Sequence, residues 1–150
     1  MSADLYERAA EYVAKWEGFS PTAYWDVNHW RIGFGSSTEG PHEVNVVKGM
    51  TTTRERAMQN LELRIPEFRY VAVRDVGKVV WDQLNMNQQI VLIDLAYNYG
   101  HIPVPVNPKE PALTAHHILQ RGKDNGGINA RRRRDEASLW IKPYKEAENA

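Results

Sequence analysis

The segment from Asn87 to Tyr99 constrains the fold of this chain more than any other. Read as a helix, it is apolar around nearly its whole circumference and is interrupted only by Asp94 and Asn98. It falls short of the roughly 18 consecutive apolar residues that a membrane span requires. A helix that is apolar all round in such a protein is a buried central helix. We therefore predict a central helix that is capped by Asn87 and closed by Gly100.

The other elements follow from the spacing of apolar and turn-forming residues. An amphipathic helix is expected over 3–17, ended by Gly18, a residue that tolerates the left-handed conformation. Two aromatic and β-branched runs, 24–27 and 30–35, flank Asn28-His29 and predict a β-hairpin. A third strand or ribbon is expected within 36–50. Further helices are expected at 79–84, at 112–121 and from 129 to 140, and a helix capped near Thr52 should be kinked or ended by Pro66.

These elements predict an α+β fold with a small hairpin lobe at about 18–50. A mainly helical lobe would cover about 51–150, together with the helix at 3–17. The length of 150 residues is the usual size of one compact domain, so we expect a single domain.

Composition excludes several classes of function. The chain has no cysteine, which rules out disulfides, a thiol nucleophile and thiolate metal sites. Its 19 Lys and Arg balance its 19 Asp and Glu, whereas a nucleic-acid binder of this size usually has a basic excess. His116 and His117 are adjacent and lack the spacing of a helical metal pair. We expect no metal, no cofactor and no nucleic acid.

Glu17 and Asp26 are the candidate acid and charged partner of a catalytic pair. Glu17 falls in the last turn of a predicted helix beside Trp16 and Phe19, and both the helix end and the apolar neighbours favour its protonated form. Asp26 follows nine residues later in a strand. One protonated and one ionised carboxyl group are what glycoside cleavage requires. The alternatives are a solvated glutamate and an aspartate that starts a turn.

The order and spacing of short motifs resemble the active-site segment of the phage-type lysozymes, the muramidase endolysins. The motifs are Glu17-Gly18, then Tyr24-Trp25-Asp26, then Arg31-Ile32-Gly33-Phe34-Gly35. The resemblance continues more weakly to about residue 140. It departs from the family pattern at Arg31, where the family has threonine, in a connection from Asp26 to Gly33 that is one residue shorter, and at Ser36.

The resemblance implies a lysozyme-like fold and cleavage of peptidoglycan between N-acetylmuramic acid and N-acetylglucosamine. It implies that Glu17 donates the proton and that Asp26 stays ionised, with Arg31 in the third catalytic position. Tyr24, Trp30, Gly33, Gly35 and Ser36 are the expected substrate-binding residues. The alternatives are a lytic transglycosylase, a non-catalytic glycan-binding or virion protein with the same fold, and a small nucleic-acid binder that uses the arginine run.

The resemblance also implies how the protein is used. The segment from Met1 to Tyr12 carries charges and lacks the apolar core of a signal peptide. We expect a monomer without stable membrane insertion that stays in the host cytoplasm until a holin-type factor releases it to the cell wall. Attachment to a virion is the alternative location.

Two further expectations concern arginines. If Asn28 and His29 form the hairpin turn, Asp26 lies directly opposite Arg31. The run from Arg131 to Arg134 spreads around a helix, so we expect a mainly solvated, accessory face that is attracted to anionic cell wall, with at least one arginine packed and paired with Asp135 or Glu136.

Overall fold

The computed structural model describes residues 2–145. The chain forms two compact units and passes from the first to the second between Glu67 and Phe68. Helices and two small antiparallel sheets build it, so the predicted α+β fold class is confirmed. The expectation of a single catalytic domain stays a prediction.

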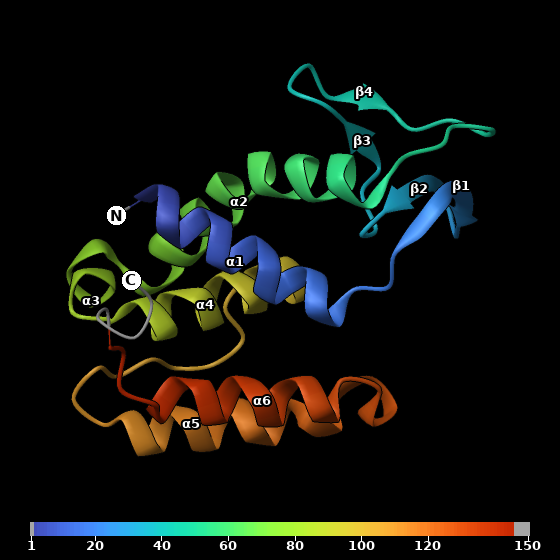
Figure 1. Cartoon of the computed structure of the whole chain (residues 1–150). Helices are drawn as coiled ribbons and strands as arrows, with labels where there is room; N and C mark the ends of the chain where they lie inside the picture. Colours follow the sequence, from blue (N-terminus) through green and yellow to red (C-terminus); the bar gives the residue numbers. More distant parts are fainter. Residues whose placement is uncertain (1, 146–150) are drawn as a thin grey trace. The chain divides into compact units, whose positions relative to one another are not determined.

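The first unit begins with α1 (Ser2–Trp16), whose small and apolar residues are buried along one face. A hairpin of β1 (Ser20–Asp26) and β2 (His29–Gly33) follows it (Figure 1). The predicted ribbon within 36–50 consists of two short antiparallel strands, β3 (Thr38–Glu39) and β4 (Val44–Asn45). Gly18 follows the end of α1 without the left-handed conformation that the sequence suggested.

The turn of the hairpin lies one residue earlier than predicted. Asp26 pairs with His29 and Tyr24 pairs with Arg31, so Val27 and Asn28 form the turn. Val27 adopts a positive φ of 57°, a conformation that is strained for a β-branched residue. The preference of asparagine and glycine for such turns gave no reason to expect a valine there. The one-residue shift changes the partner of Asp26 by two residues, so Asp26 and Arg31 still lie on the same face of the hairpin.

Helix α2 (Arg54–Val76) runs from the first unit into the second. Its first turn is capped by the Thr53 hydroxyl, which accepts a hydrogen bond from the N–H of Arg56 at 3.1 Å. Pro66 was predicted to kink or end the helix, and it does not end it, because α2 continues for ten residues beyond it. Pro66 removes one backbone hydrogen bond. The neighbouring Ile65 is fully buried, and packing of that kind can hold a helix together across a missing bond.

The second unit contains α3 (Lys78–Asp82), α4 (Met86–Tyr99), α5 (Pro111–Gln120), the short helix η1 (Arg121–Gly127) and α6 (Ala130–Ile141). The prediction of a buried helix is confirmed, since every residue of α4 from Ile90 to Ala96 is buried. Its cap is Asn85 rather than Asn87, in a reciprocal capping box with Gln88. Gly100 closes it in the left-handed conformation, as expected.

Helices α5 and α6 lie side by side in this unit (Figure 1), and α6 also packs on α4. The contact between α6 and α4 buries two arginines of the run, which corrects the prediction of a mainly solvated face. Arg132 donates two hydrogen bonds to the carboxylate of Asp94, of 2.6 and 2.9 Å. Arg133 pairs with Glu136 and also donates to Asn98 at 2.8 Å. Only the flanking Arg131 and Arg134 of this run are exposed.

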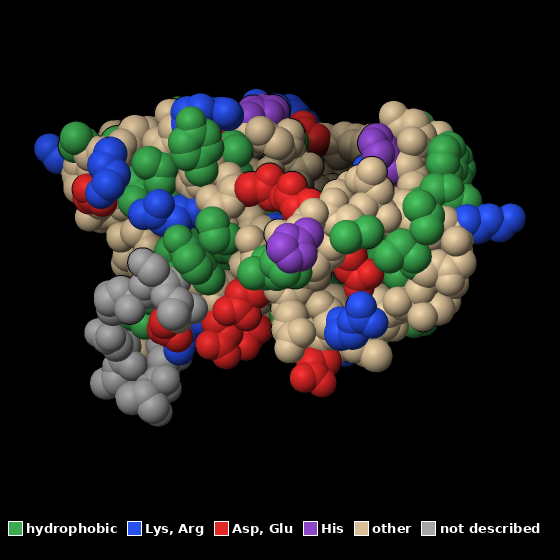
Figure 2. All heavy atoms as spheres, turned by 90° about the horizontal axis from the view of Figure 1, so that it is seen from above, with side chains coloured by type: hydrophobic (Ala, Val, Ile, Leu, Met, Phe, Trp, Pro, Cys, Tyr) green, Lys and Arg blue, Asp and Glu red, His purple; other side chains and the backbone are tan. Residues whose placement is uncertain are grey.

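No helix within residues 2–145 combines the length and the apolar character needed to cross a membrane. On the face shown in Figure 2, positively and negatively charged side chains are interspersed. That face carries no broad patch of one sign.

Candidate active site

Glu17 is held at the C-terminal end of α1. Its N–H donates to the carbonyl of Val13 at 3.1 Å, which continues the helical bonding by one residue. The side chain is half-buried, and β1 begins three residues later. The carboxyl group therefore projects from the last turn of a helix, next to the start of the hairpin, as the sequence predicted.

Asp26 and Arg31 form an ion pair on one face of the hairpin. The Nε of Arg31 donates to Oδ2 of Asp26 at 2.7 Å, and its Nη1 donates to the carbonyl of Gly35 at 3.1 Å. The two side chains are partly exposed, at 32% for Arg31 and 46% for Asp26. They meet diagonally, because Arg31 stands opposite Tyr24 in the ladder. The guanidinium thus ties Asp26 to the turn that follows β2.

The pKa of Tyr24 is affected by both carboxyl groups. Burial raises the pKa of its hydroxyl, and the negative charges of Asp26 and Glu17 raise it further, while Arg31 lowers it. Glu17 and Asp26 therefore act on the same phenol although they come from different elements. At neutral pH this phenol is a neutral group that can donate a hydrogen bond.

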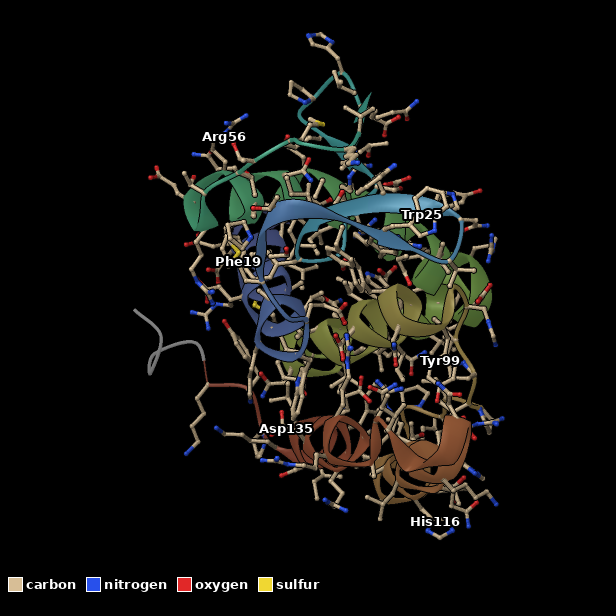
Figure 3. The ribbon with its side chains drawn as sticks, turned by 90° about the vertical axis from the view of Figure 1, so that its right-hand side faces the viewer. Phe19, Trp25, Arg56, Tyr99, His116 and Asp135 are labelled. Atoms are coloured by element: carbon tan, nitrogen blue, oxygen red, sulfur yellow. The ribbon has the colours of Figure 1, made fainter. Side chains whose placement is uncertain are left out.

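Trp30 lies on the opposite face of the hairpin from Asp26. It is the cross-strand partner of Trp25, and the two rings pack edge to face with centroids 5.6 Å apart. Trp25 is 57% exposed near the tip of the hairpin, whereas Phe19 marks the other end of β1 (Figure 3). The structure thus accounts for Trp30 by packing and does not bring it together with the carboxyl groups.

Gly33 and Ser36 have structural roles in packing the hairpin and the loop after it. Gly33 has a φ of 64°, and a Cβ atom there would lie 2.9 Å from the Cβ of Ala57 on α2. The hydroxyl of Ser36 donates to the carbonyl of Thr38 and accepts from the amide of Asn60 at 3.1 Å. These two residues hold the hairpin and the following loop against α2.

Asn60 is a structural residue that the sequence prediction missed. Its buried amide on α2 donates to the carbonyl of Thr38 at 3.1 Å, and its Oδ1 accepts from the N–H of Gly40 at 2.9 Å. The position of this uncharged polar residue beside the apolar stripe of α2 is the sequence signal that could have identified it. It fixes β3 on the helix that carries Ala57.

A separate cavity of about 470 Å³ lies between α2 and the segment with β3 and β4. Arg56, at the start of α2 (Figure 3), lies on its wall. None of the predicted site residues lines it. The contacts of Arg31 with Asp26 and Gly35 lie elsewhere in this unit.

The chain is similar to known proteins in sequence and in fold. The family model described as phage lysozyme matches residues 14–136. A point mutant of P22 lysozyme is 25% identical, with a TM-score of 0.72 over 90% of this chain and 96% of that chain. The muramidase domain of SpmX from Asticaccaulis excentricus is 20% identical, with a TM-score of 0.70 over 91% and 96%.

An endolysin from Escherichia coli O157:H7 phage FAHEc1 is 24% identical, with a TM-score of 0.68 over 92% of this chain and 94% of that chain. No curated protein sequence matches the chain.

Proposed function

The chain belongs to the phage lysozyme family, and from that premise we propose that Glu17 and Asp26 are its acid and its charged partner. Family membership makes the protein a glycoside hydrolase that cleaves the glycan strands of peptidoglycan as a muramidase. The observation that carries the assignment of these residues is the hydrogen bond of 2.7 Å from Arg31 to Asp26, on the hairpin that directly follows the helix end at Glu17. Glycoside cleavage requires two carboxyl groups that flank the scissile bond.

In this proposal Glu17 protonates the oxygen of the scissile bond. Protonation of the leaving oxygen removes the need to expel an alkoxide and is the usual task of a general acid. The half-buried side chain can meet a sugar from the side on which Tyr24 and Asp26 lie.

In this proposal the carboxylate of Asp26 stabilises the positive charge that develops on the sugar ring, or orients the attacking water. Arg31 is the positioning residue. It holds one carboxylate oxygen of Asp26 at 2.7 Å and is itself fixed by the carbonyl of Gly35. The other oxygen, Oδ1, is left to face the substrate. Arginine thus takes over the orienting task at the position where the family has threonine.

Tyr24 is the proposed substrate-binding residue on this face. Its hydroxyl can donate to a sugar oxygen, and its ring is 39% exposed. Gly35 contributes by leaving space beside Arg31. Trp30, Gly33 and Ser36 contribute through packing and hydrogen bonds that hold the hairpin in place. These assignments rest on the contacts within the hairpin unit.

The muropeptides released from purified peptidoglycan test this function. Hydrolysis leaves reducing ends, whereas a transglycosylase that uses a hydroxyl group of the sugar itself leaves anhydro ends that are lighter by one water. Mass spectrometry should therefore find reducing ends at N-acetylmuramic acid. Anhydro ends would assign the transglycosylase reaction, and binding to peptidoglycan without release of fragments would assign a non-catalytic role.

We also propose that the protein serves lysis at the end of phage infection. The endolysin among the similar structures supports this use. A monomer would accumulate in the host cytoplasm and reach the cell wall after a holin-type protein opens the membrane. Expression with and without a co-expressed holin tests the proposal, because lysis should require both proteins.

A further inference from the structure

A small polar pocket in the second unit lies apart from the hairpin residues. It has a volume of about 260 Å³ and lies between the proline-rich segment 103–105 and the end of α5. The remaining wall residues are His117, Gln120, Arg121 and Lys123. The neighbouring His116 points away from α6 into solvent (Figure 3).

Every polar side chain on the wall of this pocket can donate hydrogen bonds, and no carboxylate lines it. His117, Gln120 and Arg121 have the spacing that places side chains on one face of a helix. Lys123 follows in η1 and adds an ammonium group. An arrangement of donors without a lining carboxylate suits an anion.

The arginine of the pocket is held in place. Its Nη2 donates to the carbonyl of Pro103 at 3.0 Å, and its Nη1 lies 3.6 Å from a carboxylate oxygen of Asp124. That carboxylate also accepts a hydrogen bond from the hydroxyl of Tyr99 at 2.8 Å. Asp124 does not line the pocket, but it offsets part of the charge of Arg121. Within residues 2–145, no acidic group pairs with Lys123.

The end of α5 itself opposes an anion, because a helix C-terminus carries about half a negative charge. Arg121 and Lys123 supply two positive charges against this half charge and the single charge of Asp124. The balance stays positive without any contribution from His117.

We propose that this pocket binds a phosphate group. A tetrahedral dianion uses donors that converge from several directions, and Arg121 and Lys123 supply charged hydrogen bonds of the kind that phosphate forms. A carboxylate has only two acceptor oxygens and would use fewer of these donors. The volume exceeds that of a bare phosphate ion, so Pro103, Val104 and Pro105 can contact the carbon group that carries it.

Titration calorimetry with inorganic phosphate at constant ionic strength tests this proposal on the full chain. We expect saturable binding that weakens about tenfold in Lys123→Gln, because one charged hydrogen bond is lost. Lys109→Gln removes the same charge from an exposed position in the same unit and should bind like the wild type. Arg121→Gln provides a second variant, checked for folding by circular dichroism.

Two further arms identify the source of the phosphate and the selectivity. Binding to phosphatidylglycerol vesicles that is lost in Lys123→Gln would assign a lipid headgroup, and binding to soluble phosphate alone would assign a free phosphate. Acetate that binds as tightly as phosphate would overturn the proposal. Phosphate binding that is unchanged in both pocket variants would overturn it as well. The test does not depend on glycan cleavage.

Discussion

At the scale of single residues, Glu17 carries the sharpest prediction. Glu17→Gln keeps the size and the hydrogen-bonding groups of the side chain but removes the proton donor. The rate of peptidoglycan clearing should fall about 10²–10⁴-fold with unchanged folding. Glu11→Gln is the matched control, since it removes an exposed carboxyl group from the same helix. Near wild-type clearing by Glu17→Gln would remove this residue from the mechanism.

Arg31 is tested by Arg31→Thr, which restores the residue type of the family. The substitution removes both the positive charge beside Asp26 and the anchor on Gly35. We expect a lower kcat, because the carboxylate of Asp26 loses the group that holds its orientation.

Arg8→Thr breaks a comparable arginine–aspartate pair on α1, where Arg8 contacts Asp4 at 3.1 Å. This control should leave kcat unchanged. If Arg31→Thr also leaves kcat and the products unchanged, the pair with Asp26 is a surface ion pair worth roughly 0–1 kcal/mol and no more.

Single residues also show where prediction from sequence succeeds. The placement of Glu17 followed from a helix period and its end, and both are local properties of the chain. The network of Asn60 could not be predicted, because its partners Thr38 and Gly40 lie 20 or more residues away. Nothing in the local sequence shows which buried carbonyl an amide will reach.

At the scale of elements, the packing of β2 on α2 depends on Gly33. In Gly33→Ala the new methyl group would meet Ala57 at 2.9 Å and the backbone would stay at a positive φ. We expect a loss in the free energy of unfolding of about 2–4 kcal/mol, from overpacking and left-handed strain together. Urea unfolding measures it.

Gly40→Ala separates the two causes. Gly40 also has a positive φ, of 77°, but no atom lies within 4 Å of a Cβ placed there. This variant should lose only about 1–2 kcal/mol, which is the cost of the conformation. Equal losses in the two variants would show that the contact with Ala57 contributes nothing.

The element boundaries show how far local patterns reach. The amphipathic and apolar periods predicted the helices within a few residues, because burial of a face needs that period. The predicted hairpin turn differs from the observed one by one residue, because valine rarely adopts a positive φ. The pairing of the flanking strands holds Val27 in this conformation. Helix α2 likewise continues through Pro66, although local preference predicts a break there.

At the scale of the whole molecule, stability should depend on pH through Glu136. Burial and the neighbouring carboxylate of Asp94 raise the pKa of Glu136 to about 10, against the opposing effect of Arg133. The unfolded chain releases this proton near the ordinary glutamate pKa of about 4.3. Between these two values the folded chain binds more protons, so the free energy of unfolding falls as pH rises.

Urea unfolding at several pH values between 5 and 9 checks this effect. Glu136→Gln keeps a neutral group of the same size and should flatten the dependence. Glu62→Gln, at an exposed position, is the control and should preserve the slope. A slope that is identical in wild type and Glu136→Gln would show that Glu136 is ionised in the folded protein.

The burial of Arg132 and Arg133 has a consequence for proteolysis. Trypsin cleaves after arginine, and the run from Arg131 to Arg134 is the densest group of such bonds in the chain. In the folded protein these bonds lie within α6, and the middle two side chains are 3% and 0% exposed. A protease must bind an extended segment, so cleavage there requires α6 to detach first. The rate of tryptic cutting at this run should therefore report the opening of α6, and mass spectrometry of the fragments can follow it.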